Sequence, residues 1–270
     1  MSKIKSSIKS MKELCSLISL RGKDITGKDF CPIVEFAVGV GVKDNSHIEI
    51  NAMDKGSHMV LGIVYKTEVL EPGLLIIGNV FKFREYLDRF ENSDIVTIES
   101  TENQIIINRD SPKKTAKFPM ASESAIESAG AEKFLNTFER KGDIYTTSKT
   151  SFNVSFDVLA EEIKKVVDDG GAVDQRIYPW TIENNTLTVK VGEEARGIIE
   201  TEVPISDFKS PSSDPITIKT GYAFGIDNLF GNISGKVKIF LASGIGICPM
   251  IIEQKTETYT LKALLAPVEV

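Results

Sequence analysis

The stretch from Pro119 to Ser151 separates two halves of the chain that resemble each other. It is rich in Ser, Ala, Thr and Glu and lacks sustained apolar–polar alternation, whereas strand-like segments crowd both sides. A polar tract of this length is typical of a connector between two packed units. Phe134, Leu135 and Phe138 fall at helical spacing and predict one or two helical turns within it. We therefore expect an N-terminal domain over 1–118, a connector over 119–151 and a C-terminal domain over 152–270.

Each half is predicted to contain a helix, several strands, a short helix and three more strands. Helical periodicity runs over 7–20, and Ser155 fits the N-cap of a helix over 156–167. Shorter helices are expected at 79–90 and 222–233, with β-branched strands before and after each of them. Because order and spacing repeat together, the sequence predicts two similar α+β units in tandem.

Composition narrows the class of protein. The 270 residues are enough for two domains that each bury a core. A net charge of -6 argues against a protein whose whole surface binds nucleic acid. No apolar run approaches the ~20 residues of a membrane span, and the N-terminus lacks a signal-peptide core. We expect an intracellular protein whose cysteines are reduced thiols: Cys15, Cys31 and Cys248.

Recognisable catalytic motifs are missing from the sequence. The two histidines, His47 and His58, lie in no metal-ligand pattern. There is no P-loop, no GxGxxG after a strand and no GxSxG. We expect no enzyme activity, no metal and no cofactor.

Positive charge gathers on the predicted helices although the chain is acidic overall. Residues 1–23 carry six basic residues against one acid, Glu13. If the helices of several such units faced one another, Lys and Arg could meet phosphates without reading bases. The alternative is that these lysines form an ordinary solvated helix face.

Three segments resemble the sliding clamps of the proliferating cell nuclear antigen type. The ending from Thr260 to Val270, TLKALLAPVEV, resembles the last strand and Leu-Ala-Pro tail of that family. INAMDKGSHMVLGIV (50–64) resembles its Met-Asp-Ser-Ser-His turn with one extra residue, and KKTAKFPMAS (113–122) resembles phage and viral members. The resemblance implies two tandem clamp domains with antiparallel sheets outside and helices inside. It also implies a homotrimeric ring that encircles duplex DNA, wherever that DNA is replicated, and tethers a polymerase placed by a clamp loader.

The resemblance assigns roles to named residues. The helices lining the ring would carry Lys5, Lys9, Lys12, Lys82, Arg84, Arg89, Lys164 and Lys165. The groove for partner peptides would include Met53, His58, Met120, Ile126, Pro249, Ala266 and Pro267. Subunits would pair through 104–109 and 197–203, which contain Ile105, Ile106, Ile107, Ile198, Ile199 and Thr201. The helix at 222–233 has no basic residue, which predicts stronger DNA contact by the first half.

Two other readings stay open at this stage. A duplicated α+β protein could be a structural or assembly component, such as part of a virion, that never encircles DNA. The other possibility is an enzyme whose site residues are not recognisable. The native mass separates the clamp from the structural protein, because a clamp should assemble into a trimer.

Overall fold

The computed structural model describes residues 1–19, 33–39, 47–53, 59–122, 128–172, 177–194, 197–211, 214–221, 225–242 and 249–266. The helices are α1 (Ile8–Ile18), α2 (Val80–Leu87), α3 (Ser128–Asn136), α4 (Ala160–Ala172) and α5 (Gly225–Asn232). The strands before the connector are β1 (Lys3–Ser7), β2 (Ile33–Gly39), β3 (His47–Met53), β4 (Met59–Lys66), β5 (Glu68–Glu71), β6 (Gly73–Ile77), β7 (Ile95–Ser100), β8 (Gln104–Arg109) and β9 (Lys114–Pro119). The connector holds β10 (Glu139–Lys141), β11 (Ile144–Thr146) and β12 (Ser151–Phe152). The strands after it are β13 (Val154–Leu159), β14 (Ile177–Glu183), β15 (Thr186–Glu193), β16 (Gly197–Pro204), β17 (Ser206–Lys209), β18 (Ile216–Gly221), β19 (Lys236–Leu241), β20 (Met250–Lys255) and β21 (Tyr259–Leu265).

The two halves repeat each other element by element. In the first, the order is β1, α1, β2 to β6, α2 and β7 to β9; in the second it is β13, α4, β14 to β18, α5 and β19 to β21. The sheet β5-β1-β7-β8-β9 corresponds to β17-β13-β19-β20-β21, and β4-β3-β2-β6 corresponds to β16-β15-β14-β18. The predicted tandem α+β duplication is confirmed.

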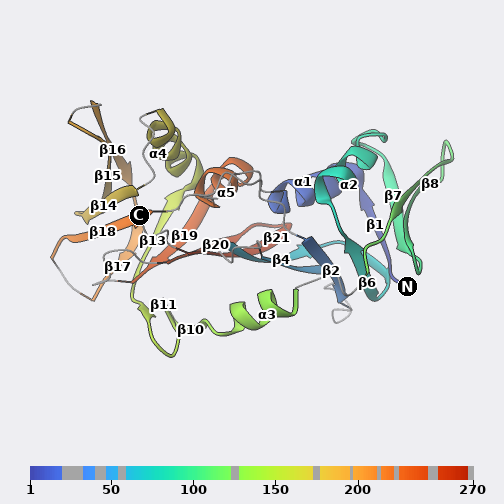
Figure 1. The fold of residues 1–270 in the computed structure, drawn as a ribbon, viewed down its shortest axis with the longest axis horizontal. Helices are drawn as coiled ribbons and strands as arrows, with labels where there is room; N and C mark the ends of the chain where they lie inside the picture. Colours follow the sequence, from blue (N-terminus) through green and yellow to red (C-terminus); the bar gives the residue numbers. More distant parts are fainter. Residues whose placement is uncertain are drawn as a thin grey trace.

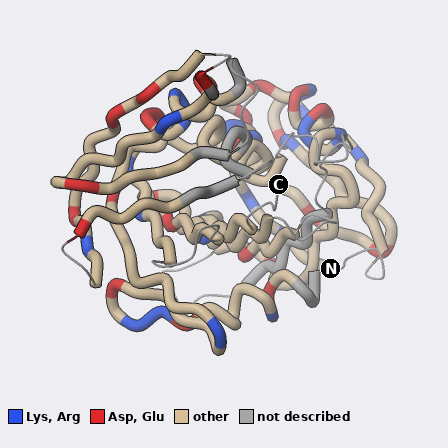
Figure 2. Tube along the Cα trace, turned by 60° about the vertical axis from the view of Figure 1, so that its left-hand side comes forward, with Lys and Arg blue, Asp and Glu red and all other residues tan. Residues whose placement is uncertain are grey.

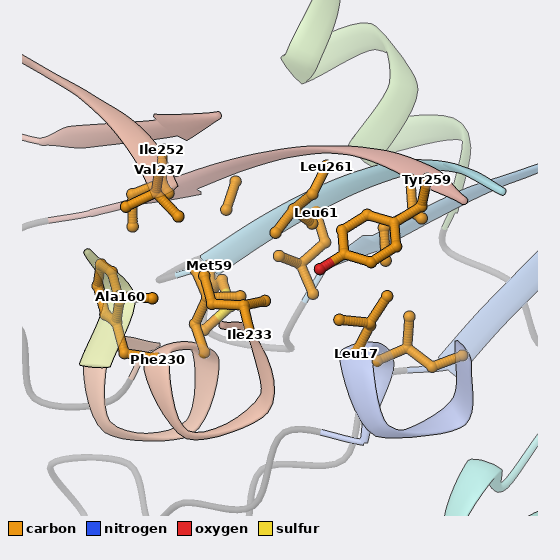
Figure 3. Close-up of a cluster of buried hydrophobic side chains, with 14 of the residues drawn as sticks. Leu17, Met59, Leu61, Ala160, Phe230, Ile233, Val237, Ile252, Tyr259 and Leu261 are labelled. Atoms are coloured by element: carbon orange, nitrogen blue, oxygen red, sulfur yellow. The ribbon is translucent and has the colours of Figure 1, made fainter. Parts of the chain in front are cut away.

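A single strand pair joins the halves. β21 pairs antiparallel with β4, so that two half-sheets fuse into a nine-stranded sheet, β17-β13-β19-β20-β21-β4-β3-β2-β6. Figure 1 shows this sheet running through the middle of the molecule, with the five-stranded and four-stranded sheets at its two ends. Figure 3 shows Leu61 of β4 and Leu261 of β21 in one buried cluster with residues of α1 and α5. The joint therefore lies inside the main hydrophobic core.

A strand precedes the first helix of each half; α1 begins at Ile8, in agreement with the predicted 7–20, whereas α4 begins later than the sequence predicts. Residues 3–7 form β1 between β5 and β7, where ladder hydrogen bonds outweigh the helical spacing of this polar segment. Ser7 then caps α1, and its hydroxyl accepts from the Ser10 N–H at 3.1 Å. The predicted N-cap at Ser155 is wrong: this residue is buried in β13, and α4 begins at Ala160. Val154, Phe156 and Val158 alternate inward there, but in the sequence a run this short and apolar is not distinguished from a helix segment by periodicity alone.

The connector is more structured than its composition suggests. The predicted helical turns are confirmed as α3, but a three-stranded sheet of β10, β11 and β12 follows it and was not predicted. Leu135 of α3 packs against the nine-stranded sheet so closely that a Cβ on Gly62 would lie 2.9 Å from its Cδ1. A glycine in β4 thus lets the connector helix reach the sheet. Tyr145, Phe152 and Phe240 complete this second core.

Candidate nucleic-acid interface

Four helices form one layer on one side of the sheets. α1 contacts α2, α4 contacts α5, and α1 also contacts α5 across the joint between the halves. Figure 1 shows α4, α5, α1 and α2 above the strands and α3 on the opposite side. The apolar face of α1, including Met11 and Leu14, is buried, so its polar face points away from the sheet. The helix layer is the surface on which the sequence placed the lysines and arginines.

Four of these cations have side chains available to an anionic ligand. Lys9 on α1, Lys82 on α2, Lys164 on α4 and Arg89 just beyond α2 are all exposed. Within the described ranges, none of the four side chains makes an ion pair or hydrogen bond. They can meet phosphates without breaking an internal contact.

Lys12 and Arg84 are engaged in holding α1 against α2. Lys12 Nζ lies 2.9 Å from Asp88 Oδ1 and donates to Asn92 Oδ1 at 3.0 Å. Arg84 Nη1 donates to Ser16 Oγ at 2.9 Å. Lys12 and Arg84 therefore hold α2 and the residues after it against α1, and the Asp88 carboxylate neutralises part of the charge of Lys12.

The second half offers a weaker basic surface than the first. α4 carries two lysines against four acids, Glu161, Glu162, Asp168 and Asp169. Lys165 lies 2.7 Å from Glu162. The backbone N–H of Glu161 itself and the Gly235 N–H both donate to the Glu161 carboxylate, and these hydrogen bonds lower its pKa. The expectation that the helices of both halves carry positive charge is wrong for α4. In Figure 2, blue and red positions are interspersed along the trace and no single basic band is seen.

Lys5 is also misplaced by the sequence prediction. It lies on β1, not on a helix, and its Nζ is 3.6 Å from Glu68 of β5. Strand β1 is interior to the five-stranded sheet, so this ion pair links two neighbouring strands. Lys5 is therefore not a member of the helix layer.

Strands β9 and β16 each leave one edge unpaired within the described residues. β9 ends the five-stranded sheet and β16 ends the four-stranded sheet, which lies at the other end of the molecule (Figure 1). Ile198, Ile199 and Thr201 lie on the edge strand β16, and their role in pairing between subunits stays a prediction. The prediction for residues 104–109 is wrong: β8 lies between β7 and β9, so Ile105, Ile106 and Ile107 have no open edge. Ile105 and Ile107 are core residues.

The structure gathers only part of the predicted peptide groove. Met53 ends β3, while Pro249 precedes β20 and Ala266 follows β21, which places the last two at the same end of that strand pair. Met53 packs against the core beneath the connector. Met120 instead follows β9 and packs against the main core, beside β6 at the far edge of the sheet. His58, Ile126 and Pro267 lie outside the described residues.

A polar cluster fastens the connector to the underside of the sheet. The hydroxyl of Tyr145 donates to Glu253 of β20, and Arg140 Nη1 donates to the same carboxylate at 2.7 Å. Lys262 of β21 donates to the Leu135 carbonyl at 3.3 Å and lies 4.5 Å from the Tyr145 ring centroid. Burial lowers the pKa of Lys262 and raises that of Tyr145. These groups were not predicted, because they converge from the connector and from strands more than a hundred residues away.

A second, more exposed contact holds the turn between β10 and β11, and it should be acid-sensitive. Asp143 lies 2.5 Å from Lys209 of β17, whose hydrogen bond lowers the pKa of that carboxyl below the ordinary value of 3.8. A lowered folded pKa means that the contact stabilises the docked turn above that value and is lost as pH falls through the lowered pKa. Hydrogen exchange of 139–146, corrected for intrinsic rates, should rise in that acidic window. Asp143→Asn should show the faster exchange already at neutral pH, whereas Glu139→Gln should not; equal exchange in both variants would contradict this.

Comparison with solved structures settles the architecture. Proliferating cellular nuclear antigen from Entamoeba histolytica superposes with a TM-score of 0.66 at 14% identity, covering 99% of both chains. PCNA from Thermococcus kodakaraensis gives a TM-score of 0.68 at 14% identity, covering 99% of this chain and 100% of that one. This chain has the sliding-clamp fold. No protein-family model and no curated protein sequence matches it, so the clamp fold is visible in its geometry and not in its overall sequence.

Among the described residues there is no metal-ligating cluster and no membrane-spanning helix. Over these residues no cluster of His, Cys, Asp and Glu is suited to hold a metal ion. No helix in the same ranges is long and apolar enough to cross a bilayer.

Proposed function

We propose that this chain is a DNA sliding clamp: a non-enzymatic protein that assembles into a ring around duplex DNA and tethers a polymerase to it. The observation that carries the proposal is the combination of a duplicated clamp fold, one shared helix layer and two unlike free edges at opposite ends. The ring would act wherever the cell or virus replicates its DNA. A clamp loader would be needed to open it.

The joint inside the chain supplies the template for closing the ring. In the repeat, β9 corresponds to β21 and β16 corresponds to β4. Pairing β9 of one protomer with β16 of the next would repeat the internal β21–β4 joint. Such a contact joins different surfaces on the two protomers, so copies add head to tail until the rotation closes. Three protomers would give six repeats around the ring, and no exposed β9 or β16 edge would remain.

The helix layer would then face the DNA. Lys9, Lys82, Arg89 and Lys164 can contact phosphates, while Lys12, Arg84 and Lys165 contribute charge that is partly committed to internal contacts. Contacts of this kind carry no sequence information. A ring retains DNA by enclosing it, so weak contacts are sufficient. The acidic α4 makes the first half of each protomer the stronger DNA contact.

The face opposite the helices is the place for partner peptides. Met53, Pro249 and Ala266 lie at strand ends beside the connector, where an apolar anchor of a polymerase or loader could bind. Met120 packs against the main core and not against the core beneath the connector, so it is not assigned to that groove.

Dependence on DNA topology tests the proposal. Protein loaded onto a closed circular plasmid should stay bound through washing at about 0.1 M salt, where the joints between protomers hold, and dissociate after one double-strand cut, whereas open linear DNA should never retain it. Salt-resistant binding to linear DNA, or no dependence on cutting, would contradict enclosure and favour a duplicated structural protein.

Reversing the free cations should weaken contact with DNA without affecting the fold. In the variant Lys9→Glu with Lys82→Glu, the salt dependence of DNA affinity should become shallower by about one unit of slope for each lysine that contacts a phosphate. The control Lys133→Glu with Lys255→Glu changes the net charge equally, on α3 and β20 away from the helix layer. Equal slopes in both variants, measured by fluorescence anisotropy, would remove these lysines from the interface.

A further inference from the structure

We infer that the ring of this chain is closed by opposite charges, with Lys113 and Lys117 at the β9 edge of one protomer beside Glu200 and Glu202 of β16 on the next. The inference rests on the proposed function, because it describes the interface of that ring. It adds the register of the strand pair, the chemistry that stabilises it and a way to open it.

The register of β9 follows from internal symmetry. The ladder between β1 and β7 ends at Ser7–Ile95, and its counterpart between β13 and β19 ends at Leu159–Lys236. Counting from these ends, Ile107 of β8 takes the place of Ile252 of β20. Their partners on the next strands are Ala116 of β9 and Ala263 of β21. Position 116 is therefore equivalent to position 263.

The register of β16 follows in the same way. The ladder between β3 and β4 ends at His47–Lys66, and the ladder between β15 and β16 ends at Thr186–Pro204. Aligning these ends makes Ile199 equivalent to Leu61, the residue that pairs with Ala263. Transferred to two protomers, the internal joint sets Ala116 opposite Ile199. The same register then gives Lys113–Glu202, Thr115–Glu200 and Lys117–Ile198, with Lys117 diagonal to Glu200.

The backbone hydrogen bonds show that the N–H and C=O groups at these positions point toward the open edges. In an antiparallel strand, alternate residues bond to opposite neighbours. The Met120 N–H bonds to Asn103, which continues the β8 ladder, so positions 117, 115 and 113 face outward. The Ile205 N–H bonds to Asn185 on the β15 side, so positions 202, 200 and 198 face outward. Within the chain the Lys66 N–H donates to the Thr258 carbonyl across the β4–β21 joint. Positions 202, 200 and 198 are equivalent to every second residue of β4 counted back from Lys66, so the transferred register requires their N–H groups to point toward β9, as they do.

Four of the side chains at these positions are charged and, among the described residues, unpaired, two on each edge. Lys113, Lys117, Glu200 and Glu202 are exposed and have no ion pair within the described residues. The residues between them turn inward and are already engaged. Lys114 donates to the Arg89 carbonyl and lies 4.9 Å from the Phe90 ring centroid, and Thr201 Oγ1 donates to Asp169 at 3.1 Å. Each edge thus keeps one sign of charge on the face away from the helices.

The equivalent positions of the internal joint show why charge is used between protomers. There, Leu264 lies opposite Val60 and Lys262 lies opposite Gly62, beneath the connector helix. That joint is covered, apolar and held by the covalent chain. The joint between protomers has no such cover, and exposed apolar strands would invite aggregation. Facing charges of opposite sign select the correct partner and leave a joint that salt can weaken.

Charge reversal on one edge, and then on both, tests the inference by sedimentation equilibrium. The three variants are Lys113→Glu with Lys117→Glu, Glu200→Lys with Glu202→Lys, and all four changes in one chain. At about 0.1 M salt, each single-edge variant should associate about tenfold more weakly at each interface, and the four-residue variant should recover to within about threefold of the wild type. Wild-type association should weaken toward about 1 M salt, where the Debye length falls from about 10 Å to about 3 Å.

The outcomes separate this inference from the proposed function. Lys133→Glu with Lys255→Glu is the control for net charge and should associate as the wild type does. If the wild type assembles and the single-edge variants assemble equally well, the charges only guard the edges and the inference is wrong. Impaired single-edge variants without recovery in the four-residue variant would refute the register. A wild type that never assembles would overturn the proposed ring and this interface with it.

Discussion

Thr115→Pro should convert the assembled protein into monomers while leaving each chain folded. The Thr115 N–H points to the open edge of β9, so its loss leaves the bonds to β8 in place. A proline there removes a donor from the ladder between protomers and leaves a carbonyl on β16 without a partner. An unsatisfied group of this kind costs about 1–3 kcal/mol, which weakens each interface roughly tenfold to a hundredfold.

Thr115→Ala is the matched control, because both variants lose the hydroxyl bond to Asn108. Sedimentation velocity should show the alanine variant assembled and the proline variant monomeric. At a protein concentration low enough for both to be monomeric, the two variants should have the same melting temperature. A proline variant that assembles as the wild type does would exclude β9 from the interface.

Leu261→Ala should be among the most damaging single changes in the core. Leu261 is fully buried on β21, opposite Ile63 of β4, at the joint between the halves. Figure 3 shows it beside Leu61 and near Tyr259. Removing a buried leucine side chain leaves a cavity and lowers the free energy of unfolding by about 2–5 kcal/mol. Because the cavity opens between the halves, the unfolding transition should also broaden.

Thr260→Ala on the same strand is the control, since Thr260 is exposed and the change should stay within about 0.5 kcal/mol. Urea unfolding followed by fluorescence measures both. A loss below about 1 kcal/mol for Leu261→Ala would show that the joint is not part of the cooperative core.

The duplication could be predicted because it follows from the periodic spacing of apolar residues along the chain. Strands such as 47–53 alternate strictly, and the short helix at 79–90 begins at Asn79, whose side chain accepts from the Lys82 N–H at 2.9 Å. Local signals of this kind survive although identity with the solved clamps is only 14%. They fixed the order of elements and the place of the connector helix.

The misplaced residues share a physical cause, which is contact with distant parts of the chain. Lys5 is in a strand because β5 and β7 pair with that segment, and neither lies within sixty residues of it. Ile106 could not be distinguished from an edge residue until β9 was seen to cover β8. The cluster of Tyr145, Glu253 and Lys262 likewise exists only after the connector folds under the sheet. Sequence spacing carries none of this information.

The account depends most on the two free edges finding each other in a closed ring, and native mass spectrometry tests that directly. At low salt and protein concentrations high enough for assembly, the predicted spectrum contains one assembled species of three chains, with monomer appearing as salt rises. A spectrum with monomer alone under all conditions, or an open-ended series of dimers, tetramers and longer chains, would contradict the ring.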